Sequence, residues 1–176
     1  MSNQLVIAAI GEDRPGLVDN LSGWILDSGC NIADSRMTVL GGEFAVLLLI
    51  EGQWNSLAKL EDQLEQAQER LGMTITVKRT KHKKPAGALL PYAVDVVALD
   101  NPGIVHNLAS FLSKRGINIK DLATSSYSAA HTGTQMFSVH MALDVPGEIQ
   151  IAGLREEFLD FCDQMNLDAV IEPMKG

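Results

Sequence analysis

The sequence predicts an α+β protein made of two tandem ferredoxin-like βαββαβ units, each an antiparallel sheet with two helices on one face. Three observations support this prediction. The two halves repeat one another at a constant offset of 87, with ten identities between residues 13–35 and residues 100–122. Each half alternates short Val- and Ile-rich runs with segments of helical periodicity. A stretch rich in charge, proline and glycine, residues 81–91, separates the halves.

Each unit is expected to open with a strand, at Leu5–Ile10 and at Tyr92–Leu99, that runs into a Pro-Gly turn. Apolar residues at helical spacing follow the turn in both halves and predict an amphipathic helix. Gly29 and Gly116 are expected to end these helices, because glycine adopts the left-handed backbone conformation without a steric cost.

The remaining elements also appear twice. After the second strand the offset between the two halves increases by six residues, because Phe44 matches Phe137. The second half is therefore expected to have a longer turn, at about Ser128–Thr134. The predicted strands and helices are Asn31–Leu40, Phe44–Ile50, Trp54–Leu71 and Met73–Lys78 in the first half, and Asn118–Ser128, Met136–Leu143, Ile149–Met165 and Leu167–Ile171 in the second. Domain 1 is therefore expected at residues 1–84, a linker at 85–91 and domain 2 at 92–176.

Composition narrows the class of protein. With 22 acidic residues against 14 Lys and Arg, the net charge of −8 argues against a general nucleic-acid binder, whose affinity comes largely from neutralised phosphates. The longest apolar block has seven residues, far fewer than the roughly 20 that cross a bilayer, and the polar first residues are unlike a secretory signal. Only Cys30 and Cys162 are present, so a reducing cytoplasm is expected.

The repeated strand–helix loops, residues 13–16 and 100–103, are candidate ligand sites. Proline fits a first helical turn, glycine lets a ligand approach the backbone, and the free amides at a helix start favour a carboxylate. An aspartate beside them can accept a ligand ammonium, so each loop can hold an amino acid. The alternative is that the aspartate only caps its helix. The predicted binding residues are Asp13, Arg14, Pro15, Gly16, Asp100, Asn101, Pro102 and Gly103.

A second repeated signature is a G-x-N-I sequence, in which Asn31 and Asn118 stand where a helix stop leads into a strand. Their amides can both donate and accept hydrogen bonds, which suits the head group of a zwitterion. The alternative is that asparagine only tolerates the turn conformation. Both signatures in both halves favour binding, because capping and turn formation do not require the same Asp and Asn twice.

Together these residues resemble the ACT domain, a small amino-acid-binding regulatory module, and the resemblance covers nearly the whole chain as two copies. It implies that ligand binds where two copies meet, between the D-x-P-G loop of one and the G-x-N-I asparagine of the other. One expected site combines Asp13, Pro15 and Gly16 with Asn118, and the other combines Asp100, Pro102 and Gly103 with Asn31. The exposed edge strand of such a sheet also makes a homodimer possible.

Several motifs of the first half further resemble a family of repressors of the glycine cleavage system, among them residues 11–16, 30–36, 40–44 and 78–80. The resemblance implies a cytoplasmic repressor that does not read DNA itself, acts on a DNA-binding transcriptional regulator and takes glycine as its signal. A regulatory subunit that modulates a metabolic enzyme in response to an amino acid is the alternative.

Other side chains indicate no chemistry of their own. The four histidines and two cysteines lack metal-ligand spacing, and no nucleophile, phosphate or dinucleotide motif is present, so no cofactor and no enzymatic activity are expected. His106 and Asp19 occupy the same helical position and are expected on the surface. The basic cluster Lys78–Lys84 is a docking patch for an acidic partner or DNA, or only a solvated strand end. Trp54 is either a core residue or a partner contact.

Overall fold

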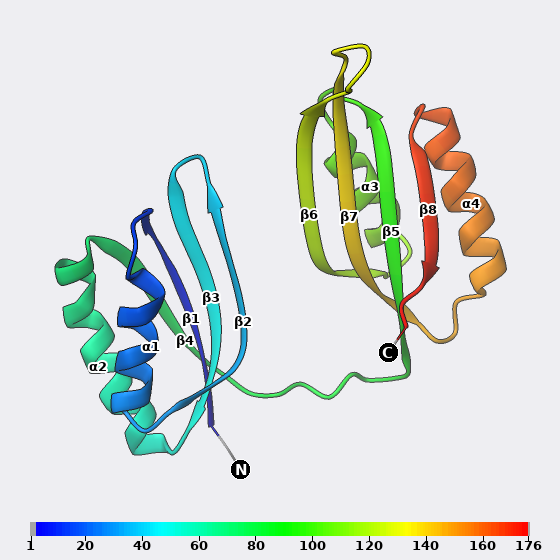
Figure 1. The fold of residues 1–176 in the computed structure, drawn as a ribbon. Coiled ribbons are helices and arrows are strands. Elements are labelled where there is room, and N and C mark those ends of the chain that lie inside the picture. Colours follow the sequence, from blue (N-terminus) through cyan, green and yellow to red (C-terminus); the bar gives the residue numbers. More distant parts are fainter. Residues whose placement is uncertain (1–2, 176) are drawn as a thin grey trace. The chain divides into compact units, whose positions relative to one another are not determined.

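The computed structural model describes residues 3–175, and the chain divides into two units that meet between Lys84 and Pro85. We call the units domain 1 and domain 2 (Figure 1). Within residues 3–175, no helix is both long and apolar enough to cross a membrane.

Domain 1 has the predicted βαββαβ order and one antiparallel sheet with strand order β2-β3-β1-β4. The central strands β1 and β3 pair from Asn3 with Gly52 to Glu12 with Glu43. Its elements are β1 (Asn3–Glu12), α1 (Leu17–Asp27), β2 (Asn31–Leu40), β3 (Glu43–Gly52), α2 (Trp54–Leu71) and β4 (Met73–Thr80).

Domain 2 repeats this topology with the order β6-β7-β5-β8. Its β-bulge, between Ile119 and Asp121, lies at the same place in the repeat as the bulge between Ile32 and Asp34 in domain 1. Its elements are β5 (Leu89–Leu99), α3 (Ile104–Ser113), β6 (Asn118–Ser128), β7 (Gln135–Pro146), α4 (Ile151–Gln164) and β8 (Asp168–Pro173).

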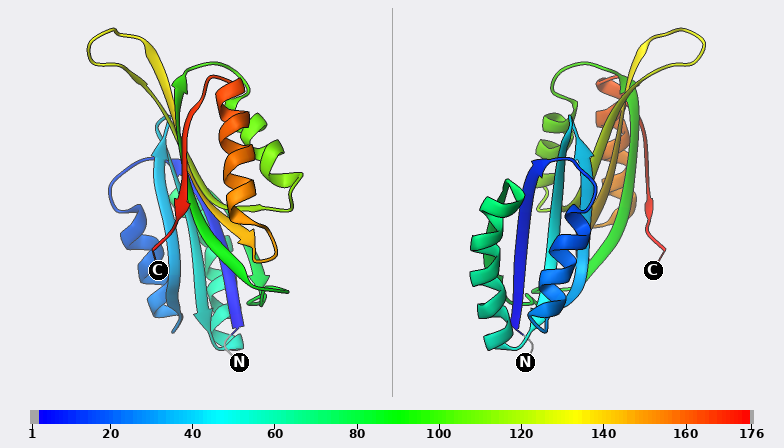
Figure 2. Two further views of the ribbon diagram at one scale, coloured as in Figure 1. Left: turned by 90° about the vertical axis from the view of Figure 1, so that its right-hand side faces the viewer. Right: turned by 60° about the vertical axis from the view of Figure 1, so that its left-hand side comes forward.

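Each domain has its own apolar core between its sheet and the two helices that cover one face of that sheet (Figure 2). Alternate residues of the central strands are buried, as in Leu5, Ile7 and Ala9 of β1, because successive side chains of a strand point to opposite faces. The helices contribute the apolar stripe that their periodicity predicts, including Leu57, Leu60, Leu64, Ala67 and Leu71 of α2. The fold class predicted from the sequence is therefore confirmed.

The structure departs from the predicted linker at one point. β5 begins at Leu89, so Leu89–Pro91 belong to a strand rather than to the linker. Pro91 pairs with Asp144 of β7, whereas the pairing of β5 with β8 ends at Tyr92. Proline is therefore tolerated, because β8 does not extend along this part of β5 and no ladder donor is needed on that side.

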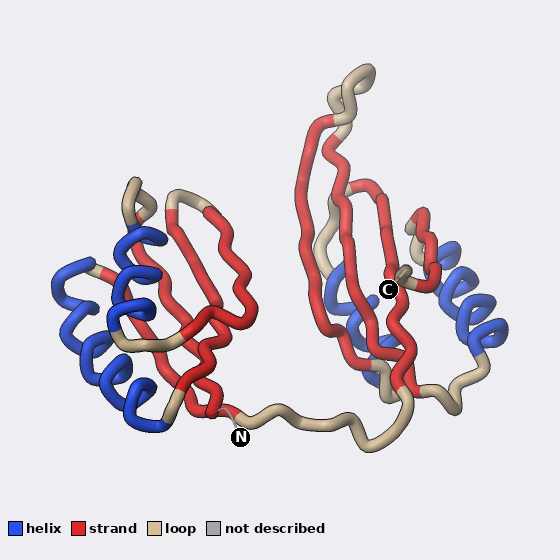
Figure 3. Tube along the Cα trace, turned by 60° about the horizontal axis from the view of Figure 1, so that its bottom comes forward, coloured by secondary structure: helices blue, strands red, loops and turns tan. Residues whose placement is uncertain are grey.

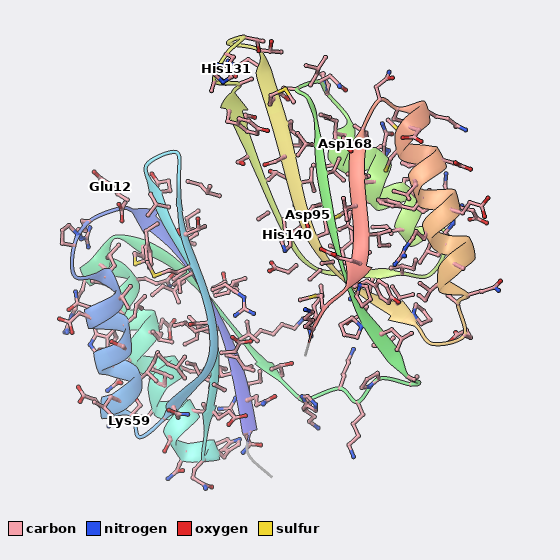
Figure 4. The ribbon with its side chains drawn as sticks, turned by 45° about the vertical axis from the view of Figure 1, so that its right-hand side comes forward. Glu12, Lys59, Asp95, His131, His140 and Asp168 are labelled. Atoms are coloured by element: carbon pink, nitrogen blue, oxygen red, sulfur yellow. The ribbon has the colours of Figure 1, made fainter. Side chains whose placement is uncertain are left out.

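The strands β2 and β6 lie at the edges of their sheets. Every residue of β2 is exposed, whereas Phe44, Val46 and Leu48 of the neighbouring β3 are buried. The hairpin between β6 and β7 carries the longer turn predicted from the sequence, with His131 at its tip (Figure 4).

Candidate functional site

The strand–helix loop of domain 1 joins the end of β1 to the start of α1. Its four residues, 13–16, are exposed, and the backbone amide of Asp13 donates a 3.1 Å hydrogen bond to the carbonyl oxygen of Gly42. The loop is thus tied to the β2–β3 turn, and both lie at the same end of the domain (Figure 3). Domain 2 repeats this arrangement, with the Asp100 amide donating a 3.0 Å hydrogen bond to the Gln135 carbonyl oxygen.

A glycine in the left-handed conformation directly precedes each of the two helices that follow these loops. Gly16 has φ 94° and Gly103 has φ 92°, and each is the residue before the first helical turn. Neither helix has a side-chain hydrogen bond at this position among the described residues. The aspartates therefore do not cap their helices, and the capping interpretation is wrong.

The uncapped starts leave backbone donors available to a ligand. The amides of Asn20 and Asn107 form the first bonds inside the two helices, to Gly16 and Gly103, and the amides before them have no partner within an α-helix. The positive end of the helix dipole adds to their attraction for an anion. A carboxylate fits this chemistry in both domains.

The two aspartates have different surroundings. Within residues 3–175, the Asp13 carboxylate forms no hydrogen bond or ion pair, so it can accept bonds from an ammonium group. Asp100 Oδ2 accepts a 3.4 Å hydrogen bond from Ser126 Oγ. The first loop therefore has the more accessible acceptor.

The other polar side chains of the loops donate hydrogen bonds to backbone carbonyl oxygens of their own domains. The Arg14 guanidinium donates to the carbonyl oxygen of Leu71 at the end of α2, and Asn101 Nδ2 donates to the Leu99 carbonyl oxygen at 3.1 Å. These contacts brace the loops, and a role for either side chain in binding stays a prediction.

The predicted asparagines lie at the opposite end of each sheet from the loops. Asn31 opens β2 and pairs with Glu51 of β3, whereas the loop follows Glu12, which pairs with Glu43. Glu43 and Glu51 are eight residues apart along β3. The loop and Asn31 are therefore about 26 Å apart along the sheet. Asn118, which pairs with Asp144, is equally far from its own loop. No domain can bring its own loop and its own asparagine to one ligand.

The cysteines and histidines do not form a reactive or metal-binding group. Burial raises the pKa of Cys30, partly offset by Lys59, and burial with the nearby Asp163 raises the pKa of Cys162 to about 12. Within residues 3–175, no three His, Cys, Asp or Glu side chains are placed to hold a metal ion. His140 Nδ1 lies 2.7 Å from Asp95 Oδ1 on the face of the second sheet without helices (Figure 4).

The basic cluster and Trp54 are also placed by the structure. Trp54 is 66% exposed and is not a core residue. The Arg79 guanidinium lies 5.3 Å from the centre of its ring and forms a 2.7 Å ion pair with Glu61. One of the cluster's charges is therefore already paired within domain 1. His106 and Asp19 are exposed, as the sequence predicts.

Comparison with known proteins identifies the family of domain 1. A sequence model of the ACT domain matches residues 3–78. The glycine cleavage system transcriptional repressor of Escherichia coli (strain K12) is 29% identical over 169 residues, which are 95% of this chain and 88% of the relative. A UPF0237 protein of Methanopyrus kandleri is 36% identical over 74 residues, 41% of this chain and 82% of that protein.

Solved structures agree over the whole chain. One provisionally described as a glycine cleavage system transcriptional repressor has a TM-score of 0.74 and 26% identity, covering 100% of this chain and 99% of its own. A protein from Galdieria sulphuraria has a TM-score of 0.77 and 24% identity over 99% of this chain and 100% of its own, which supports the fold. Residues 3–78 belong to the ACT domain family, and domain 2 repeats the same fold.

Proposed function

We propose that this protein is an amino-acid-sensing regulator that represses the glycine cleavage system through a DNA-binding protein partner, with glycine as the signal. The observation that supports binding is the pair of uncapped helix starts, each beside an aspartate and each repeated in the other domain. The likeness to the named repressor over 95% of the chain supports the regulatory role. A transcription regulator as partner places this activity in the cytoplasm.

The proposed contacts follow from the chemistry of a free amino acid. Its carboxylate accepts hydrogen bonds from the first amides of α1 or α3, and its ammonium donates to Asp13 or Asp100. An asparagine from another copy of the fold completes the head-group site, because each domain's own asparagine lies about 26 Å away along the sheet. The predicted combinations are the loop of domain 1 with Asn118 and the loop of domain 2 with Asn31.

The expected affinity is modest. Glycine has almost no apolar surface, so charge-assisted hydrogen bonds worth about 1.5–3 kcal/mol each supply most of the binding energy. After the entropy of association is subtracted, the dissociation constant should lie on the order of micromolar to millimolar.

Regulation then follows from linkage between two binding events. An amino acid that joins two copies of the fold stabilises one arrangement of them, and a partner that prefers another arrangement binds less tightly. Coupling of about 1–3 kcal/mol changes partner affinity by roughly five- to 150-fold.

Two measurements test the proposal. Calorimetric titration of the full chain with glycine and the other amino acids should show saturable binding, and the absence of binding by every amino acid would refute the sensing role. Affinity capture with and without glycine should recover a DNA-binding regulator in a glycine-dependent manner. Recovery of a metabolic enzyme instead would support the alternative, a regulatory subunit.

A further inference from the structure

An apolar pocket lies beside α1 in domain 1, on the face of the sheet that carries the helices. It has a volume of about 100 Å³ and is bounded by α1, the edge strand β2 and β3. The pocket lies where the buried residues of β3 meet the exposed inner face of the edge strand β2. Its lining is Val18, Leu21, Ser22, Ile32, Ser35, Met37, Phe44, Val46 and Leu48.

The pocket begins where the head group of the ligand is proposed to bind. Val18, one of its walls, is the second residue of α1 and belongs to the turn whose amides are uncapped. Phe44, another wall, is two residues from Gly42, whose carbonyl oxygen holds the Asp13 amide. An amino acid bound through its carboxylate at the start of α1 can therefore extend its side chain into this space.

The size and polarity of the pocket indicate the class of side chain. A closed apolar cavity of about 150 Å³ accommodates benzene, so about 100 Å³ corresponds to a branched or linear chain of roughly three or four carbons. Seven of the nine lining residues are hydrophobic, and no ionisable side chain is among them. Glycine would leave this apolar space unfilled.

At the corresponding place in domain 2 a leucine replaces Ser35, and the smaller Thr124 replaces Met37. Ser35 pairs with Leu48 across β2 and β3, and the equivalent pair across β6 and β7 is Leu122 with Met141. The repeat also places Ala109 at the position of Ser22. The leucine in place of Ser35 adds apolar volume where domain 1 has space.

We propose that domain 1 binds an amino acid with an aliphatic side chain, such as valine, leucine or methionine, in preference to glycine, and that glycine is left to domain 2. The proposal rests on the proposed function, since it uses the same head-group contacts. It changes the class of ligand at one of the two sites, so the protein would respond to two amino-acid signals.

The test uses the full chain and a variant that fills the pocket. Calorimetric titration should give leucine or methionine an affinity at least about tenfold higher than glycine at one class of site, the gain expected from burying an aliphatic side chain. Ser35→Leu, which introduces the residue found in domain 2, should weaken leucine binding about tenfold or more and change glycine binding less than twofold. Ser35 is exposed on an edge strand, so the variant should keep the melting temperature of the parent.

The matched control is Thr38→Leu. Thr38 is exposed on the same strand and pairs with Ala45, on the face opposite the pocket, so this variant should bind leucine normally. Three results would overturn the inference: glycine binding at least as tightly as leucine at every site, equal weakening of both ligands by Ser35→Leu, or weakening of leucine by Thr38→Leu. Binding of glycine only would leave the proposed function intact, whereas binding of no amino acid would refute both.

Discussion

The backbone amide of Asp13 is hydrogen-bonded to the carbonyl oxygen of Gly42 at 3.1 Å. This bond joins the loop before α1 to the turn between β2 and β3, and domain 2 has the same bond between Asp100 and Gln135. A ligand that orders the loop therefore also restrains the hairpin that contains the exposed edge strand. Because an edge strand is a surface where another chain can pair, under the proposed function this bond would link ligand binding to partner binding.

Removing the proposed ammonium acceptor should abolish one site without unfolding the protein. Asp13→Ala is expected to lower amino-acid affinity at that site at least about tenfold, because a charge-assisted bond is worth about 1.5–3 kcal/mol. The side chain is exposed and caps no helix, so the melting temperature should change by less than about 2 °C. Calorimetry and thermal unfolding measure the two effects.

The matched control for Asp13 is Glu12→Ala, which removes a neighbouring exposed carboxylate at the end of β1 (Figure 4) and should leave affinity unchanged. Asn118→Ala should weaken the same site as Asp13→Ala, and the double variant should weaken that site further while leaving the other class of site unchanged. Unchanged binding in both single variants would rule out the proposed pairing of loop and asparagine.

Two glycines of domain 1 should respond oppositely to alanine. Gly16 has φ 94°, and among the described residues an added Cβ would meet no atom within 4 Å, so the cost of Gly16→Ala is the left-handed backbone, about 1–2 kcal/mol. Gly23 has equal space and an ordinary helical position in α1. Gly23→Ala should stabilise domain 1 by about 0.5–1 kcal/mol. Urea denaturation of both variants is the measurement, and a stabilised Gly16→Ala would contradict the observed backbone.

Arg14 should contribute to stability rather than to binding. Its guanidinium donates to the carbonyl oxygen of Leu71, one of the helix-end acceptors without a partner inside α2. Arg14→Ala is expected to lower the free energy of unfolding by about 1 kcal/mol and to change amino-acid affinity less than threefold. A variant of normal stability that has lost binding would instead assign Arg14 to the ligand, as the sequence predicts.

The buried thiols should make the protein less stable in alkaline solution. The pKa of Cys162 is about 12, above its ordinary value of 9.0, because of burial and Asp163. The folded state therefore keeps a proton that the unfolded state releases, and this contribution to stability is complete below pH 9 and is lost between about pH 9 and 12. Denaturation at several pH values should show the decline, and Cys162→Ala should reduce it. At pH 8 an alkylating reagent should modify Cys162 and Cys30 only after unfolding.

Periodicity predicted most of the fold because the helices and the central strands each bury one face. Asn31–Leu40, Asn118–Ser128 and Trp54–Leu71 have the predicted bounds. The central strands extend further than predicted, since polar ends such as Asn3 and Glu12 continue the backbone ladder while their side chains stay in water. Hydrophobic patterning carries no signal for such residues.

The site was only partly predictable for a different reason. The repeated Asp-x-Pro-Gly pattern located the loops, but it did not show whether the aspartate caps the helix. The answer depends on Gly16, whose left-handed conformation makes it the residue before the helix, so that the helix begins beyond Asp13. The contact between Arg14 and Leu71 joins residues 57 positions apart, and no local pattern encodes it. The pocket beside Ser35 depends on how far α1 covers β2, which is a matter of packing.

The placement of Asp13 and Asn31 at opposite ends of one sheet has a consequence for any attempt to shorten the protein. A fragment of one domain would hold half of each of two head-group sites and would have to pair with a copy of itself to complete them. Its response would then follow the square of its own concentration as well as the amount of amino acid. Under the proposed pairing of domain 1 with domain 2, the tandem chain would not have this dependence, so its response to the amino acid would stay the same when its own concentration changes.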